Sequence, residues 1–256
     1  GYSPTQWQRS RLPAEYQGKV RVIFDGIDPQ VWRPLTPESR TVAGFELPPG
    51  RPIVSYVSRG FESMRGFDVF MKAARRLYQR RPDVFFVVVG SERIVYGGDE
   101  RWTGGKSFKD WVLAQDQYDL SYFHFLGPIP PHELARLFCL TDLHIYLTVP
   151  FVLSWSLMNA LACGAIVLAS DTAPVQEMVK DGHNGLLVDF HDVEGFAETA
   201  ARVLADPVSY RPLGQAAAEM VRQHYSLDVC LPQMLRLYQE AMSSGAPEQI
   251  SCGPSS

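Results

Sequence analysis

Two arginines, Arg59 and Arg65, stand six positions apart in a short segment that also contains Gly60 and ends at Gly66. Two guanidinium groups can hold a diphosphate through paired hydrogen bonds and can neutralise its charge as it leaves. The glycines let the backbone bend around such a ligand. We therefore assign Arg59 and Arg65 as candidate catalytic residues and place Gly60 with them in a diphosphate site. The alternative is a solvated loop with two ordinary surface arginines.

A second anion site is expected at Ser154, which has the residue type and the position of a helix N-cap. The backbone amides of Trp155 and Ser156 would then point into a crevice, where free N–H groups and the helix dipole favour a phosphate. Asn159 lies about 6 Å further along the helix, roughly a phosphate-to-ribose distance. Because its neighbours are apolar, we expect its amide to have a partner, either a ribose hydroxyl or the backbone of a nearby loop.

A proline-rich loop, residues 127–133, leads into another expected helix. Gly127, Pro128 and Ile129, together with Leu134, form a candidate site for the base of a nucleotide. The prolines can equally serve only to stiffen the connection.

Glu177 follows a turn and is expected in the first turn of a short helix. The helix dipole alone accounts for a carboxylate there, but Glu177 is also a candidate to face a bound sugar. The six histidines show no arrangement with Ser, Cys or Asp that is typical of nucleophilic catalysis, and we assign none of them a catalytic role.

The elements that must position these residues alternate along the chain. Apolar runs predict strands at residues 53–57, 84–89, 122–126, 143–147, 166–169 and 186–188, with a further short strand at 20–24. Helical periodicity is found at residues 66–80, 108–115, 132–140, 154–163, 193–205, 208–225 and 227–243. This alternation predicts an α/β fold with a Rossmann-like, doubly wound parallel sheet, in which ligands bind at the carboxyl ends of the strands.

The bulk composition is that of an ordinary globular protein, with 46% hydrophobic and 20% charged residues among 256. A net charge of −4 argues against nucleic acid and an anionic membrane surface as partners. No apolar stretch reaches the ~20 residues of a membrane span. The four cysteines lie far apart, so we expect neither a zinc site nor disulfides, and we expect a cytoplasmic protein.

The chain divides into three parts by composition. Residues 1–40 are rich in turn signals, and several prolines make the stretch from 29 to 49 linker-like. Residues 41–243 carry the regular pattern and form one domain, in which residues 91–120 are either a functional insertion or a mobile surface excursion. Residues 244–256 are small and polar, and we expect a disordered tail.

The order and spacing of these motifs resemble the C-terminal domain of glycosyltransferase family 4 (group 1), retaining enzymes of two-domain GT-B architecture. The Arg59 and Arg65-Gly66 pair is similar to the family's Arg and Lys-Gly phosphate pair. Further similar segments lie at residues 5–8, 20–28, 125–127, 134, 141–142, 159–167, 174–177 and 184–188. The resemblance covers residues 1–243 and implies a domain that binds a nucleoside-diphosphate sugar. It also implies that residues 1–40 are the end of an N-terminal domain and an interdomain linker.

Two positions depart from the family pattern. The family usually has glutamates at the positions held here by Phe151 and Asn159. Asn159 can still bind ribose hydroxyls, though with neutral hydrogen bonds of about half the strength. Phe151 cannot replace the charge of the first glutamate, which is linked to the transferred sugar. We place Phe151, Val152 and Leu153 with Glu177 as candidate sugar contacts.

The resemblance implies a hexosyltransferase-type enzyme that needs no metal or other cofactor, because two arginines and a helix dipole supply positive charge. Its acceptor-binding N-terminal domain would lie outside this chain, so we expect the chain alone to bind the donor weakly and to transfer nothing. Two alternatives stay open, namely a non-catalytic nucleotide-sugar-binding or interaction module and a nucleotide-sugar epimerase.

Overall fold

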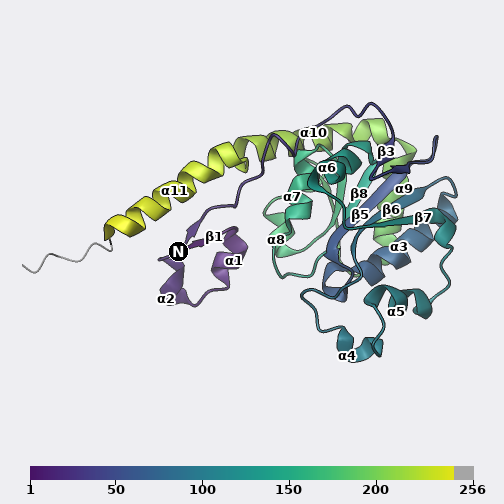
Figure 1. Cartoon of the computed structure of the whole chain (residues 1–256), viewed down its shortest axis with the longest axis horizontal. Coiled ribbons are helices and arrows are strands. Elements are labelled where there is room, and N and C mark those ends of the chain that lie inside the picture. The colour runs from purple at the N-terminus through teal and green to yellow at the C-terminus, as the bar shows by residue number, and fades with distance from the viewer. Residues whose placement is uncertain (245–256) are drawn as a thin grey trace, which may run out of the picture.

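The computed structural model describes residues 1–244 and is built around a six-stranded parallel sheet (Figure 1). The strands are β5 (Ile53–Gly60), β6 (Phe85–Ser91), β7 (Phe123–Gly127), β8 (Leu143–Tyr146), β9 (Val167–Ser170) and β10 (Leu186–Val188). Their spatial order is β10-β9-β8-β5-β6-β7, and every neighbouring pair is parallel. If β5 to β10 are numbered 1 to 6 and the sheet is followed from β7, the order is 3-2-1-4-5-6, which is that of a Rossmann sheet. This order confirms the expected fold class.

Helices cover both faces of the sheet. One face packs against α3 (Phe67–Arg80), α5 (Phe108–Gln115) and α9 (Val193–Ala205), and the other against α6 (Pro131–Leu140), α7 (Trp155–Ala162) and α10 (Pro207–His224). Alternate residues of one strand therefore enter different cores. In β5, Val54 and Tyr56 face the first set of helices, while Ile53 and Val57 face the second. Burial on both sides explains why these strands read as continuous apolar runs.

The expected helices and core strands form within one to three residues of the predicted bounds. The strand at 186–188 and the helices at 108–115 and 193–205 have the predicted bounds. The strand expected at 20–24 is shorter, because only β2 (Arg21–Val22) pairs, in parallel, with β1 (Tyr2–Ser3) in a separate small sheet. Sequence patterns missed β1 and the short helices α1 (Gln6–Ser10), α2 (Ala14–Gln17) and α8 (Ala173–Gln176), which have too few residues to show a period.

The linker-like stretch contains a hairpin that the sequence analysis did not predict. Strands β3 (Thr41–Val42) and β4 (Phe45–Glu46) are joined by Ala43 and Gly44, whose φ angles of 47° and 82° form a tight turn. Val42 is completely buried in the main core, and the Ala43 amide donates to the Glu133 carboxylate at 2.7 Å. The hairpin is therefore attached to α6 and to the core.

The excursion between β6 and β7 is folded. It contains α4 (Glu100–Thr103) and α5, and Phe108 and Val112 of α5 are buried in the core beside α3. Part of residues 91–120 is therefore packed against the core, and the function of this stretch stays a prediction.

At the other end of the chain, α11 (Leu227–Ser244) extends away from the sheet domain, towards the side where the N-terminal elements lie (Figure 1). Ser244, expected to begin the tail, ends this helix, and the rest of the expected tail, residues 245–256, lies outside the described residues. Within residues 1–244, no helix is both long and apolar enough to cross a membrane.

Gly60, the last residue of β5, allows the excursion to pass close to the strand. A Cβ atom at this position would lie 2.2 Å from the Arg93 carbonyl oxygen and 2.7 Å from a methyl carbon of Val95. Both distances are well inside van der Waals contact, so only glycine fits while the backbone at residue 93 stays in place.

We expect Gly60→Ala to lower the free energy of unfolding by about 1–3 kcal/mol, because the added methyl group must push the backbone at residue 93 away. Urea denaturation followed by circular dichroism measures this change. Gly18→Ala is the matched control, since a Cβ atom at Gly18 meets nothing within 4 Å. Equal midpoints for Gly60→Ala and Gly18→Ala would contradict the packing argument.

His144 is buried in the middle of β8. Its Nδ1 lies 3.0 Å from the Ser55 hydroxyl, and its ring stands edge-on to Phe138 at 5.0 Å. Burial lowers the pKa of His144 from 6.5 to about 3. The unfolded chain therefore takes up a proton below about pH 6.5, while the folded chain does not until about pH 3. Stability must fall as the pH drops through this window.

We expect His144→Gln to flatten the dependence of unfolding free energy on pH between 7 and 5, where protonation of the unfolded histidine costs the parent about 2 kcal/mol at pH 5. His183→Gln, at an exposed turn, should keep the parent slope. Urea titrations at several pH values measure both. An unchanged slope in His144→Gln would show that this residue does not control acid sensitivity.

Candidate functional site

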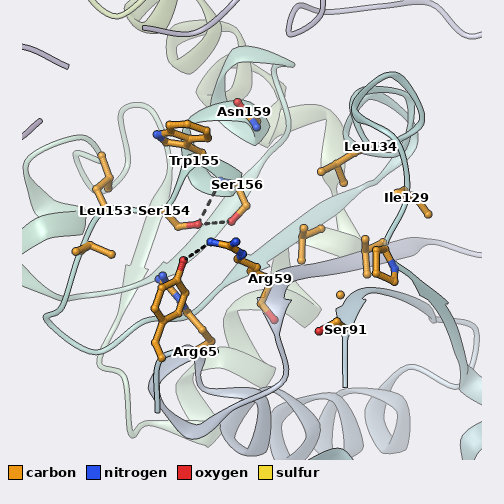
Figure 2. Close-up of a pocket in the computed structure, with 17 residues that line it drawn as sticks. Arg59, Arg65, Ser91, Ile129, Leu134, Leu153, Ser154, Trp155, Ser156 and Asn159 are labelled. Atoms are coloured by element: carbon orange, nitrogen blue, oxygen red, sulfur yellow. Dashed lines mark hydrogen bonds between the residues drawn. The ribbon is translucent and has the colours of Figure 1, made fainter. Parts of the chain in front are cut away.

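A cleft of about 480 Å³ opens where four strands of the sheet end at their carboxyl side (Figure 2). Its walls come from the carboxyl ends of β5 and β6 and from the segments that follow β5, β6, β7 and β8, which meet at the point where the strand order reverses. The lining residues are Val57, Ser58, Arg59, Arg65, Val89, Gly90, Ser91, Tyr96, Pro128, Ile129, Leu134, Val152, Leu153, Ser154, Trp155, Ser156 and Asn159.

The two arginines of the predicted diphosphate site both line this cleft, but their surroundings differ. Arg59 is exposed, and its Nη1 donates to the Tyr96 hydroxyl at 3.0 Å. Arg65 is only 6% exposed, and its Nη1 donates to Thr148 Oγ1 at 3.1 Å. The backbone of Arg65 is fixed as well, because its carbonyl accepts the buried Tyr56 hydroxyl at 2.7 Å.

Local backbone geometry places Arg65 under the cleft. Residues Ser63–Arg65 form a 3₁₀ turn, and Gly66 then adopts a left-handed conformation with φ of 62° before α3 begins. A side chain at Gly66 would also approach the Leu147 Cβ to 2.7 Å. Gly60 does not line the cleft, and its role is the close contact with residue 93.

The helix N-terminus at Ser154 forms as predicted. The Ser154 side chain accepts the Ser156 amide at 3.3 Å, and the Ser154 and Ser156 hydroxyls lie 2.8 Å apart (Figure 2). The expectation that both the Trp155 and the Ser156 amides face the crevice unpaired is wrong for Ser156, because the cap uses its N–H. In the described part of the chain, the Trp155 amide has no hydrogen-bond partner.

The Trp155 side chain lies at the rim and reaches out of the domain. It is 63% exposed, and its indole N–H donates to the Asp25 carboxylate at 2.9 Å. This bond joins the rim of the cleft to the segment that precedes the sheet domain.

Asn159 lies deeper in the cleft, one turn along α7, and is 9% exposed. No hydrogen bond to its side-chain amide is found within residues 1–244, so the alternative of a core asparagine bonded to a neighbouring loop does not hold. A nearly buried amide without a protein partner leaves its hydrogen-bonding groups to a ligand or to water.

The predicted base site is divided. Pro128, Ile129 and Leu134 line the side of the cleft nearest β7, and Ile129 and Leu134 pack against the main core. Gly127 does not line it; with φ of 67°, it turns the chain at the end of β7.

The four candidate sugar contacts also separate. Val152 and Leu153 line the cleft. Phe151 does not, but its ring lies 5.8 Å from the Arg65 guanidinium carbon and 5.5 Å from the Tyr96 ring.

Glu177 does not lie where the sequence predicted it. It caps the carboxyl end of α8 rather than lying in the first turn of a helix. Its carboxylate accepts the amides of Gln6 and Trp7, at 2.7 and 2.9 Å, at the start of α1. Both oxygens are therefore engaged by the N-terminal segment.

Sequence reasoning missed Tyr96 and Thr148, both of which contact the arginines. Tyr96 stands before Gly97 and Gly98 in the stretch that follows β6, and this position at the carboxyl edge of the sheet was the available signal. Thr148 lies two residues after the end of β8 and gave the same kind of signal. Within residues 1–244, no group of three or more His, Cys, Asp and Glu side chains is placed to hold a metal ion.

Two family models and several known proteins match the chain. The model of the family "Glycosyl transferases group 1" matches residues 40–220, and that of "Glycosyl transferase family 4 group" matches residues 1–31. Alpha-maltose-1-phosphate synthase of Mycolicibacterium smegmatis is 28% identical over 236 residues, covering 89% of this chain and 58% of that protein. D-inositol 3-phosphate glycosyltransferase of Corynebacterium aurimucosum is also 28% identical, covering 90% and 53%. The chain thus spans little more than half the length of these curated relatives.

Solved structures share the fold. Sucrose-phosphate synthase from Thermosynechococcus elongatus has a TM-score of 0.74 at 24% identity, over 95% of this chain and 58% of that one. Anabaena Alr3699/HepE in complex with UDP-glucose has a TM-score of 0.77 at 18% identity, over 93% and 63%. Since the first family model alone covers more than half of the residues, the chain belongs to the glycosyl transferases group 1 family.

Proposed function

We propose that the cleft binds a nucleoside-diphosphate sugar and that the whole protein transfers the sugar to an acceptor with retention of configuration. The observation that carries this proposal is the buried guanidinium of Arg65. Within residues 1–244 no carboxylate forms an ion pair with it, and a second guanidinium, that of Arg59, lines the same cleft. Thr148 and the rings of Tyr96 and Phe151 contact Arg65, but a buried charge without an opposite charge beside it is costly, so an anionic ligand would stabilise this arrangement.

A diphosphate suits the geometry better than a single small anion. The cleft runs from the arginines to the N-terminus of α7, where the Trp155 amide and the helix dipole offer a second favourable position for negative charge. In the proposed reaction, Arg59 and Arg65 stabilise the charge that develops on the diphosphate as its bond to the sugar breaks.

The remaining walls match the other parts of such a donor. Asn159 offers hydrogen bonds to ribose hydroxyls, and Pro128, Ile129 and Leu134 offer an apolar surface to the base. Val152 and Leu153 would border the sugar, and Phe151, which does not line the cleft, would pack beside Arg65. A UDP-glucose complex of Anabaena Alr3699/HepE, which shares the fold, supports a ligand of this class.

We further propose that donor binding needs no metal ion, because two guanidinium groups and a helix N-terminus provide the positive charge. The chain spans little more than half the length of its curated relatives, and we propose that the acceptor site belongs to the part of such proteins that this chain does not span. If the whole protein released no sugar from any donor that it binds, a non-catalytic binding module would be the better description.

We expect the chain to bind one of UDP, GDP or ADP, and Arg59→Ala and Arg65→Ala each to weaken that binding about tenfold or more, because a hydrogen bond to a charged group is worth about 1.5–3 kcal/mol. Isothermal titration calorimetry in the presence and absence of EDTA measures affinity and metal dependence together.

Arg76→Ala is the matched control, because Arg76 pairs with Glu194 on an exposed surface and does not line the cleft. Circular dichroism checks that the Arg65 variant folds. Affinity that survives both cleft substitutions would exclude the diphosphate site, and loss of binding in EDTA would exclude the metal-free mode.

We expect Asn159→Ala to weaken binding of the preferred nucleoside diphosphate about 3- to 10-fold, since a neutral hydrogen bond contributes about 0.5–1.5 kcal/mol. The loss should disappear for the 2′,3′-dideoxy analogue, which has no ribose hydroxyls to bond. Calorimetry with the two nucleotides gives the comparison, and an equal loss for both would place the ribose elsewhere.

A further inference from the structure

Arg59 and Arg65 are held in different ways. Arg65 is buried, bonded to Thr148 and fixed through its own carbonyl. Arg59 is exposed, and within residues 1–244 the Tyr96 hydroxyl is the one side-chain partner of its guanidinium. An exposed arginine side chain samples many rotamers, so a ligand that must order it binds more weakly.

Tyr96 contacts both arginines at once. Its hydroxyl accepts from Arg59 Nη1 at 3.0 Å, the bond drawn at Arg59 in Figure 2, and its ring centre lies 5.9 Å from the Arg59 guanidinium carbon. The same ring lies 5.4 Å from the guanidinium carbon of Arg65, within the range of a cation–π contact. Tyr96 therefore lies over the pair and faces the cleft, which it also lines.

Tyr96 can do this only if its backbone is fixed, and a buried carboxylate fixes it. Glu62 is completely buried, and its Oε2 accepts three consecutive amides, those of Val95, Tyr96 and Gly97, at 3.2, 2.9 and 2.8 Å. Hydrogen bonds to a buried charged acceptor are stronger than neutral ones, so this contact holds the segment firmly.

A second buried carboxylate, that of Asp99, connects the stretch after β6 to Ser63. Asp99 is 1% exposed and accepts both the amide and the hydroxyl of Ser63, at 2.8 and 2.6 Å. The two contacts are reciprocal, since Glu62 binds the excursion and Asp99 of the excursion binds the residue after Glu62. The loop that follows β6 is thereby tied to the turn that carries Arg65.

From these contacts we propose that Tyr96 is a positioning residue, anchored by Glu62, that presets Arg59 for the diphosphate. The inference rests on the proposed function and adds residues from the excursion to it. The hydroxyl oxygen accepts from Arg59, which leaves its proton free to donate to a phosphate oxygen, and the other guanidinium donors remain available to the same ligand.

The test compares nucleoside diphosphates with the matching monophosphates, so that the contribution of the second phosphate is isolated. The whole chain is titrated with three pairs of nucleotides: UDP and UMP, GDP and GMP, and ADP and AMP. The pair whose diphosphate binds most tightly is then used for the variants. Tyr96→Phe keeps the ring and removes the hydroxyl. We expect it to lower the diphosphate affinity about 3- to 10-fold and to leave the monophosphate affinity unchanged.

Glu62→Gln keeps the shape of the side chain and removes its charge. It should lower the ratio of diphosphate affinity to monophosphate affinity, by a smaller factor than Tyr96→Phe does. Tyr16→Phe, an exposed tyrosine on α2 outside the cleft, is the control and should change neither affinity. If the role of Tyr96 were merely structural, Tyr96→Phe would weaken the binding of the diphosphate and of the monophosphate by the same factor.

Two failures are distinguishable. If Arg59→Ala lowers the diphosphate-to-monophosphate ratio but Tyr96→Phe does not, or if Tyr96→Phe binds the diphosphate more tightly, the positioning role is overturned while the proposed function stands. If the unmodified chain binds the diphosphate no more tightly than the monophosphate, both the positioning role and the proposed function are overturned.

Discussion

The central place of β5 in the sheet is the constraint on which the cleft depends. Because β5 pairs with β6 on one side and with β8 on the other, the segments that follow these three strands meet at one edge. Arg65 uses this meeting point, since its guanidinium bonds to Thr148 after β8 and lies under Tyr96 after β6. A strand order that separated β5 from β6 or from β8 would leave a buried cation without these contacts, so this part of the fold and the anion site are specified together.

Much of this arrangement could be predicted from the sequence, and the reason is periodicity. Strands buried on both faces give continuous apolar runs, and helices such as α9 show a clear apolar stripe, so their bounds were predicted closely. Ser154 was identified as a helix cap because its residue type and position suffice. Arg59, Arg65 and Asn159 were placed at one cleft because each follows a strand of a parallel sheet.

The rest depends on contacts between distant segments, which a local pattern does not contain. Nothing near Glu62 indicates that its carboxylate binds amides more than thirty residues away, and Tyr96 was missed for that reason. Glu177 was misjudged in the same way, because its partners are residues 6 and 7. Gly60 was assigned to a ligand when the backbone at Arg93 is what requires it.

That requirement at Gly60 has an evolutionary consequence. A side chain at position 60 is compatible with this backbone only if the chain at residues 93–95 is rerouted, and a rerouted segment would carry Tyr96 away from Arg59. The end of β5 and the start of the excursion should therefore change together among homologues, as a linked pair. Lineages that lose the glycine should also lose the tyrosine, and with it this way of holding the exposed arginine.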